Sequence, residues 1–253
     1  MNTVERNYFK PTFILVDIEG TTTSISFVKD FLFPYARSRL KDHVEKYWYE
    51  PEFKEDLSLL KEQATQDLEN NVEGFIPILD GDDAIKSVVN NVLWQMDMDR
   101  KTKALKSLQG HIWQRGYEEG LIKGHIYDDV EPCLQKWKNL GKSICVYSSG
   151  SVQAQKLLFG KTEKGNLLPL FSAYFDTNVG QKIESKSYTR IAQKLNCQPK
   201  DILFLTDVSK EARAAAEAGL QAVLLSRPGN APLSSQDYKD FLVISNFNEL
   251  NVL

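Results

Sequence analysis

A short apolar run that ends in two carboxylates constrains this chain more than any other feature. Residues Phe13–Val16 are apolar, Asp17 follows them directly, and Glu19 comes two positions later. A strand that is apolar on both faces is typical of a parallel sheet whose two sides are covered by helices. Ligands bind just outside the carboxyl ends of such strands. The pattern therefore predicts a buried strand that carries Asp17 to a functional site.

The glycine after this acidic pair predicts a tight turn. Gly20 lets the backbone turn sharply and keeps the loop amides accessible to an anion. An Asp and a Glu before a glycine also form ordinary solvated turns. This segment alone does not separate the two interpretations, but three segments further along the chain do.

Two hydroxyl side chains follow a second strand-like run. Ser148 and Ser149 come after residues 142–147, and residues 152–159 then form a predicted helix. Hydroxyls and free amides that meet at a strand end and a helix N-terminus make an anion site. Ser149 or Ser151 would also serve as an ordinary N-cap, which is a common use of serine.

A third apolar run leads to another carboxylate. Residues 202–205 precede Asp207, and an alanine-rich helix is predicted at 212–218. Asp207 therefore stands in the same relation to its strand as Asp17 does to its own. Two carboxylates at neighbouring strand ends repel each other unless a cation lies between them, and such oxygen ligands suit Mg²⁺. The alternative role for Asp207 is the N-cap of the following helix.

A lysine in the loop 180–186 supplies positive charge ahead of an amphipathic helix predicted at 188–195. The ammonium of Lys182 can bind phosphate and hold an anionic nucleophile in place. Loop lysines are usually only solvated, and Lys186 is the nearest competitor for the role. The assignment of Lys182 therefore depends on the other three segments.

The order acid, hydroxyl, lysine and acid resembles the four motifs of the haloacid-dehalogenase superfamily of Asp-nucleophile phosphohydrolases. Further segments resemble the enolase-phosphatases of methionine salvage, and this resemblance spans nearly the whole chain. The segments that carry it are residues 17–22, 26–30, 32–35, 91–96, 99–101, 147–159 and 203–208.

The resemblance implies an Mg²⁺-dependent phosphoric monoester hydrolase of the acireductone synthase type. Asp17 would attack phosphorus, and Glu19 would act as general acid and base, a place where most of the superfamily has Asp. Mg²⁺ would be held by Asp17, Asp207 and the backbone carbonyl of Glu19. Glu211 would orient Asp207 or a metal-bound water. The substrate-binding residues would be Ser148, Ser149 and Lys182.

The narrower family implies a particular substrate. It is 2,3-diketo-5-methylthiopentyl-1-phosphate, which is enolised and then dephosphorylated to the aci-reductone 1,2-dihydroxy-3-keto-5-methylthiopentene. A capped phosphatase for another small phosphate ester would share all four motifs. A phospho-acceptor signalling module also combines acids, a hydroxyl and a lysine on a doubly wound sheet, but it lacks an inserted cap.

The organisation of the chain follows from where the strand-like runs stop and restart. Between them the pattern is helical: Ile85, Val88 and Val92 recur with the spacing of an amphipathic helix. We expect an α/β fold with a doubly wound parallel-sheet (Rossmann-like) core and an inserted α-helical cap domain. The core would comprise residues 1–27 plus 124–253, and the cap residues 28–123.

Two finer expectations concern this organisation. The cap would close over Asp17 and exclude water, with Trp94, Met96 and Trp113 as candidates for an apolar substrate pocket or, more simply, for core packing. Where the α/β pattern resumes, Pro132 is predicted as the first residue of a helix.

Composition agrees with a soluble enzyme. A net charge of −3 over 253 residues argues against a broad nucleic-acid surface. No apolar stretch approaches the ~20 residues of a membrane span, and three widely spaced cysteines indicate reduced thiols. We expect a monomer that binds no nucleic acid and no membrane. We place it in the cytoplasm, with the nucleus open as a second location.

Overall fold

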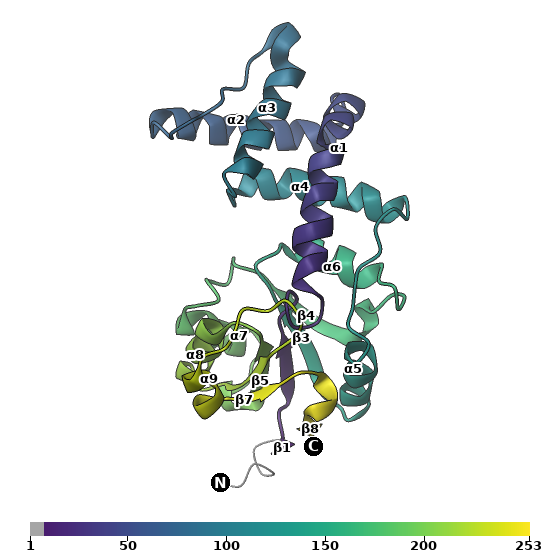
Figure 1. Ribbon diagram of the computed structural model, residues 1–253, viewed down its shortest axis with the longest axis vertical. Helices are drawn as coiled ribbons and strands as arrows, with labels where there is room; N and C mark the ends of the chain where they lie inside the picture. Colours follow the sequence, from purple (N-terminus) through teal and green to yellow (C-terminus); the bar gives the residue numbers. More distant parts are fainter. Residues whose placement is uncertain (1–7) are drawn as a thin grey trace. The chain divides into compact units, whose positions relative to one another are not determined.

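The computed structural model describes residues 8–253, which form two units. One unit comprises residues 8–28 and 123–253, and the other comprises residues 29–122. The boundaries expected from the sequence, after residues 27 and 123, each differ from these by one residue. The expected core also included residues 1–7, which lie outside the described residues. Figure 1 shows the elements of both units.

The first unit is built on a six-stranded sheet with the order β4-β3-β2-β5-β6-β7. Every neighbouring pair in this sheet is parallel. A separate two-stranded sheet pairs β1 with β8. The strands are β1 Tyr8–Phe9, β2 Phe13–Val16, β3 Ser143–Tyr147, β4 Phe171–Phe175, β5 Ile202–Thr206, β6 Gln221–Leu225, β7 Leu242–Ile244 and β8 Asn251–Val252.

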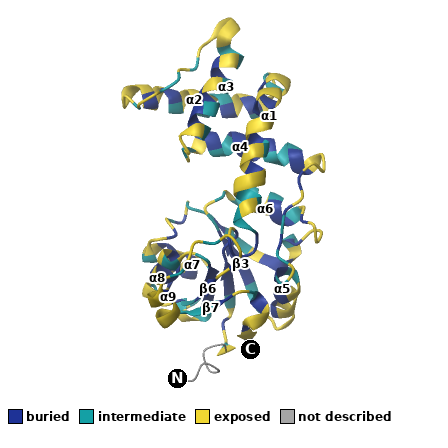
Figure 2. Cartoon of the chain, viewed as in Figure 1, coloured by how far each residue is buried: buried dark blue, intermediate teal, exposed yellow. Residues whose placement is uncertain are grey.

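Helices cover both faces of the large sheet. Ile14 and Val16 pack in one core with residues of α5 and α6, whereas Leu15 packs in a second core with residues of α7 and α8. Successive side chains of a strand point to opposite faces, so a strand covered on both sides must be apolar throughout. The helices of this unit are α5 Val130–Asn139, α6 Val152–Gly160, α7 Ser185–Lys194, α8 Ser209–Glu217 and α9 Ser235–Asp240. The predicted doubly wound α/β fold is confirmed. Figure 2 shows β3 and β6 as largely buried strands.

The chain reverses its progress across the sheet at β2. From β2 it moves to β3 and β4 on one side, and it then returns to β5 on the other side. Val16 is in register with Val146 of β3 and with Leu205 of β5. The loops that follow these three parallel strands therefore open at one edge of the sheet, where ligands bind in folds of this kind.

The second unit is helical and has its own apolar core. Val88 and Val92 are fully buried there, as their helical spacing predicts. Trp94 is buried against Phe75 and Arg100, and Met96 and Trp113 pack against the helical core, so all three side chains contribute to packing. The helices are α1 Phe33–Tyr47, α2 Pro51–Glu69, α3 Ala84–Asp97 and α4 Lys103–Glu118, and a π-helix at Phe27–Leu32 precedes α1.

Some helix ends differ from the expectation. Helix α5 begins at Val130, so Pro132 is its third residue rather than its first. A proline is tolerated there because the first N–H groups of a helix have no partner within it. Helix α8 begins at Ser209, three residues before the alanine-rich run. Within residues 8–253, no helix is long and apolar enough to cross a membrane.

Candidate functional site

Asp17 lies at the end of β2 with its carboxylate held on both oxygens. It is only 4% exposed. Its Oδ1 accepts a hydrogen bond from the Ile18 amide at 2.7 Å, and its Oδ2 lies 2.7 Å from Lys182 Nζ. The strand end and these two contacts fix the carboxylate in one orientation, which suits a group that must attack along a defined line.

Lys182 is buried between two carboxylates. Its Nζ lies 2.7 Å from Asp17 Oδ2 and 2.7 Å from Glu211 Oε2. Burial alone would lower the pKa of Lys182, but Asp17 and Glu211 raise that pKa overall. The side chain is therefore a permanent ammonium. Lys186, the competitor for this role, is exposed. The structure therefore places Lys182, and not Lys186, beside the carboxylate of Asp17.

Two tyrosines fix the loop that carries this lysine. The hydroxyl of Tyr188 donates to the Lys182 carbonyl at 2.6 Å, and the hydroxyl of Tyr147 donates to the Gly180 carbonyl at 2.9 Å. Tyr188 comes from α7 and Tyr147 from β3. The lysine is thus positioned by α7 and by β3 of the sheet whose strands β2 and β5 carry the aspartates.

Asp207 follows β5 and lies against Gly20 of the first loop. A Cβ placed on Gly20 would lie 2.4 Å from Asp207 Oδ2, and Gly20 has φ +70°. Only glycine combines that backbone with so close an approach. Burial first, and then the charge of Asp17, raise the pKa of Asp207 to about 7. The N-cap of α8 is Val208 and not Asp207.

The remaining predicted residues lie in the loops of the same sheet edge. Glu19 is exposed, and the Gly20 amide donates to the Thr23 carbonyl at 2.8 Å to close the turn. Ser148 follows β3, and its Oγ accepts the Gly150 amide at 3.3 Å. Ser149 is exposed. The N-cap of α6 is the next serine, at position 151, so neither predicted serine is used as that cap.

Glu211 differs from its expected role. It was expected to orient Asp207 or a metal-bound water, but its Oε2 bonds Lys182 and accepts a hydrogen bond from Thr206 Oγ1 at 2.8 Å. Glu211 lies in the first turn of α8, where its side chain meets both Thr206 of β5 and the buried ammonium of Lys182. Sequence reasoning also missed Thr206, since a threonine at the end of a strand carries no distinctive pattern.

The donor set at this edge suits a hard cation. Asp17 and Asp207 supply carboxylates, and their mutual repulsion is one cause of the raised pKa of Asp207. Within residues 8–253, no group of three or more His, Cys, Asp or Glu side chains is arranged to hold a metal ion. Two carboxylates with a backbone carbonyl nevertheless fit Mg²⁺, which keeps several waters and needs few protein ligands.

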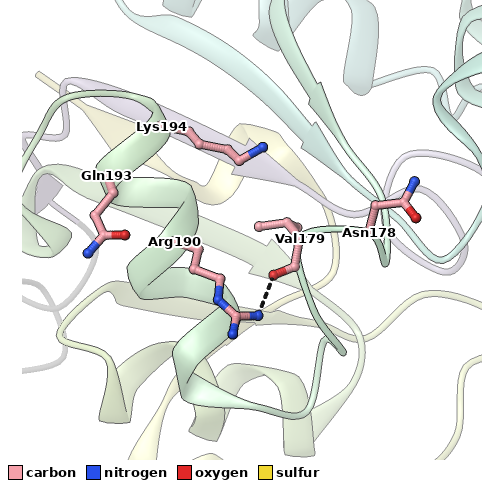
Figure 3. A pocket seen from close by; sticks show the side chains of 5 residues that line it. All are labelled: Asn178, Val179, Arg190, Gln193 and Lys194. Atoms are coloured by element: carbon pink, nitrogen blue, oxygen red, sulfur yellow. Dashed lines mark hydrogen bonds between the residues drawn. The ribbon is translucent and has the colours of Figure 1, made fainter.

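A pocket of about 380 Å³ lies between α7 and the residues just before Gly180 (Figure 3). Its lining residues are Asn178, Val179, Arg190, Gln193 and Lys194. Arg190 Nη1 donates to the Val179 carbonyl at 3.0 Å. None of the predicted site residues lines this pocket, so it is separate from the Asp17 site.

Comparison with known proteins agrees with this geometry. Residues 12–219 match the family of haloacid dehalogenase-like hydrolases. A crystal structure of the UTR4 protein from Saccharomyces cerevisiae is 32% identical, with a TM-score of 0.75 over 95% of this chain and 100% of that chain. The protein is thus a haloacid dehalogenase-like hydrolase.

Closer relatives narrow the family. Enolase-phosphatase E1 of Danio rerio is 49% identical over 245 residues, which cover 94% of each chain. Enolase-phosphatase E1 of Acyrthosiphon pisum is 54% identical over 237 residues, which cover 94% of this chain and 96% of that one. The chain belongs to the enolase-phosphatase E1 family, as the sequence motifs predicted.

Proposed function

We propose that this protein is an Mg²⁺-dependent enolase-phosphatase of methionine salvage. Its substrate would be 2,3-diketo-5-methylthiopentyl-1-phosphate, and its product the aci-reductone 1,2-dihydroxy-3-keto-5-methylthiopentene. The observation that carries the proposal is the buried Asp17 at the end of β2, paired with Lys182 at 2.7 Å, in a chain of this family. Family membership supports the choice of substrate.

The phosphoryl transfer would proceed in two displacements. Asp17 attacks phosphorus, and the bond to the ester oxygen breaks, which yields an aspartyl-phosphate. Glu19 gives a proton to the leaving oxygen and then takes one from the attacking water. The second displacement breaks the bond between phosphorus and Asp17 and restores the carboxylate.

Lys182, Ser148 and Ser149 would bind the phosphoryl oxygens. Asp17 and Glu211 occupy two of the three N–H donors of the Lys182 ammonium, so the third can bind a phosphoryl oxygen. Asp17, Asp207 and the Glu19 carbonyl would hold Mg²⁺, which when bound offsets the repulsion between an anionic nucleophile and an anionic phosphate. Thr206 and Glu211 keep the lysine in place.

The proposal extends to three properties inferred from the sequence. The helical unit would act as the cap that excludes water during turnover. The enzyme would be a cytoplasmic monomer, with the nucleus open as a second location.

The test is to incubate the purified protein with Mg²⁺ and a panel of phosphate esters that includes the diketone. Phosphate release and enol absorbance are followed in parallel, and Asp17→Asn serves as the inactive control. We expect both signals with the diketone and little phosphate release from the other esters. Equal turnover of the other esters would favour a phosphatase of different specificity. Stable phosphorylation of the protein without turnover would favour a signalling module.

A further inference from the structure

Asn230 brings an unpaired amide oxygen to the edge of the candidate cation site. Its Oδ1 is buried and has no hydrogen-bond partner within residues 8–253. A Cβ placed on Gly20 would lie 2.9 Å from this oxygen and 2.4 Å from Asp207 Oδ2. The amide oxygen and the carboxylate therefore flank the same point beside the Gly20 backbone.

The orientation of this amide is set by chemistry. Asn230 Nδ2 donates to the Gly20 carbonyl at 2.9 Å and to the Leu225 carbonyl at 3.2 Å. Two carbonyl oxygens can be satisfied only by the NH₂ end of the amide, since the other end is itself an acceptor. The Oδ1 atom then points away from both carbonyls, toward the point where a Cβ on Gly20 would meet Asp207 Oδ2. A buried acceptor without a donor is costly, so this position calls for a donor from outside the chain.

The loop that carries Asn230 is anchored. Arg227 is buried, and its guanidinium forms two bonds to Asp129, at 2.7 and 2.8 Å. The Arg227 Nε donates to the Thr21 carbonyl at 3.1 Å, and the backbone N–H of Asn230 donates to the Arg227 carbonyl at 3.1 Å. The side chains of Arg227 and Asn230 thus bond the consecutive carbonyls of Thr21 and Gly20. These bonds fix the side-chain amide of Asn230 relative to the loop that follows β2.

We propose that Asn230 is a positioning residue whose Oδ1 accepts a hydrogen bond from a water of the cation held by Asp17 and Asp207. The inference rests on the proposed function, because it needs a hydrated cation at those carboxylates. Hydrated Mg²⁺ is the donor that fits, since it keeps several of its waters in protein sites. Protein groups that bond to such waters contribute to metal affinity although they do not touch the metal.

The experiment measures Mg²⁺ affinity by isothermal titration calorimetry on the full chain. Asn230→Ala removes both ends of the amide, and the expected result is about 10-fold weaker binding or more. Asn230→Asp keeps an oxygen acceptor but cannot donate to the Gly20 and Leu225 carbonyls, so we expect it to recover part of the affinity. Asn166→Ala is the matched control, because Asn166 also bonds the backbone, accepting the Leu168 amide at 3.0 Å, and we expect it to bind as wild type does.

Two results would overturn the inference. Wild-type affinity in Asn230→Ala would show that the oxygen is not used. Binding by Asn230→Asp that is no stronger than by Asn230→Ala would show that only the bonds to the two carbonyls matter. Failure of the proposed function would instead appear in the wild-type protein, as absent Mg²⁺ binding and absent turnover.

A measurement on the unmodified protein guards against a variant that does not fold. With ¹⁵N-labelled asparagine, the side-chain amide signals of Asn230 should shift during a Mg²⁺ titration, while those of Asn166 should not. An Asn230 signal that does not move at saturating Mg²⁺ would contradict the proposal.

Discussion

Replacing Lys182 with methionine should be one of the most destabilising single changes in the α/β unit. Lys182 is 6% exposed, and its ammonium lies 2.7 Å from both Asp17 and Glu211. Methionine keeps the apolar stem but leaves two buried carboxylates without their cation. Removing one partner of a buried ion pair costs about 3–5 kcal/mol. That is a large share of the roughly 5–15 kcal/mol by which proteins of this kind are stable.

The assay is urea denaturation followed by circular dichroism at neutral pH. Lys186→Met is the control, because Lys186 is exposed and lies four residues further along, as the second residue of α7. The loss in this variant should stay within about 0.5 kcal/mol. With chelator, Lys182→Met should lose about 3–5 kcal/mol of unfolding free energy. Saturating Mg²⁺ should recover part of that loss, because a cation at Asp17 and Asp207 replaces some of the missing positive charge. A loss below about 1 kcal/mol, or an equal loss in both variants, would refute the reasoning.

Three further predictions concern single residues. Glu19→Ala should lower phosphate release by roughly 10²–10⁴-fold and keep Mg²⁺ binding, as seen in parallel kinetic and calorimetric assays, since only the acid and base is lost; unchanged release would reduce Glu19 to a turn residue. Gly20→Ala should abolish Mg²⁺ binding, because its Cβ would meet Asp207 Oδ2 at 2.4 Å. A calorimetric Mg²⁺ titration of this variant that matches the wild type would contradict the prediction. Burial lowers the pKa of His43 to about 4 in the folded protein. As pH falls, the imidazole of His43 is therefore protonated in the unfolded chain before it is protonated in the folded one. Stability should therefore fall by up to about 3 kcal/mol as pH drops from 6.5 to 4, relative to His43→Leu, in pH-dependent urea melts; identical pH profiles would count against it.

The sequence predicted the strands of the site because burial leaves a direct record in composition. Residues of β2 must be apolar on both faces, and the first charge then marks the strand end. The registers of β3 and β5 against β2 bring Ser148 and Asp207 to the edge where Asp17 lies. This arrangement follows from the parallel topology, so the pattern of strands and acids was enough to predict it.

Contacts between distant loops left no such record. Asn230 bonds the carbonyl of Gly20 from a position 210 residues later in the chain, and an asparagine in a loop has many ordinary uses. Glu211 was expected, from the family resemblance, to orient Asp207 or a metal-bound water, whereas its Oε2 pairs with Lys182. The first residue of α5 was placed at Pro132 from a residue preference, whereas the helix begins two positions earlier at Val130, because the first three positions of a helix all tolerate a residue without an N–H.

The most direct test of the central claim is to trap the phosphorylated enzyme during turnover. The wild-type protein is mixed with Mg²⁺ and the diketone phosphate, quenched in milliseconds, and treated with borohydride, which reduces an acyl phosphate to an alcohol. Peptide mass spectrometry should then find homoserine in place of Asp17, in an amount that rises before steady state, and none in Asp17→Asn. Rapid phosphate release with Asp17 unmodified at every quench time would contradict an Asp17 nucleophile.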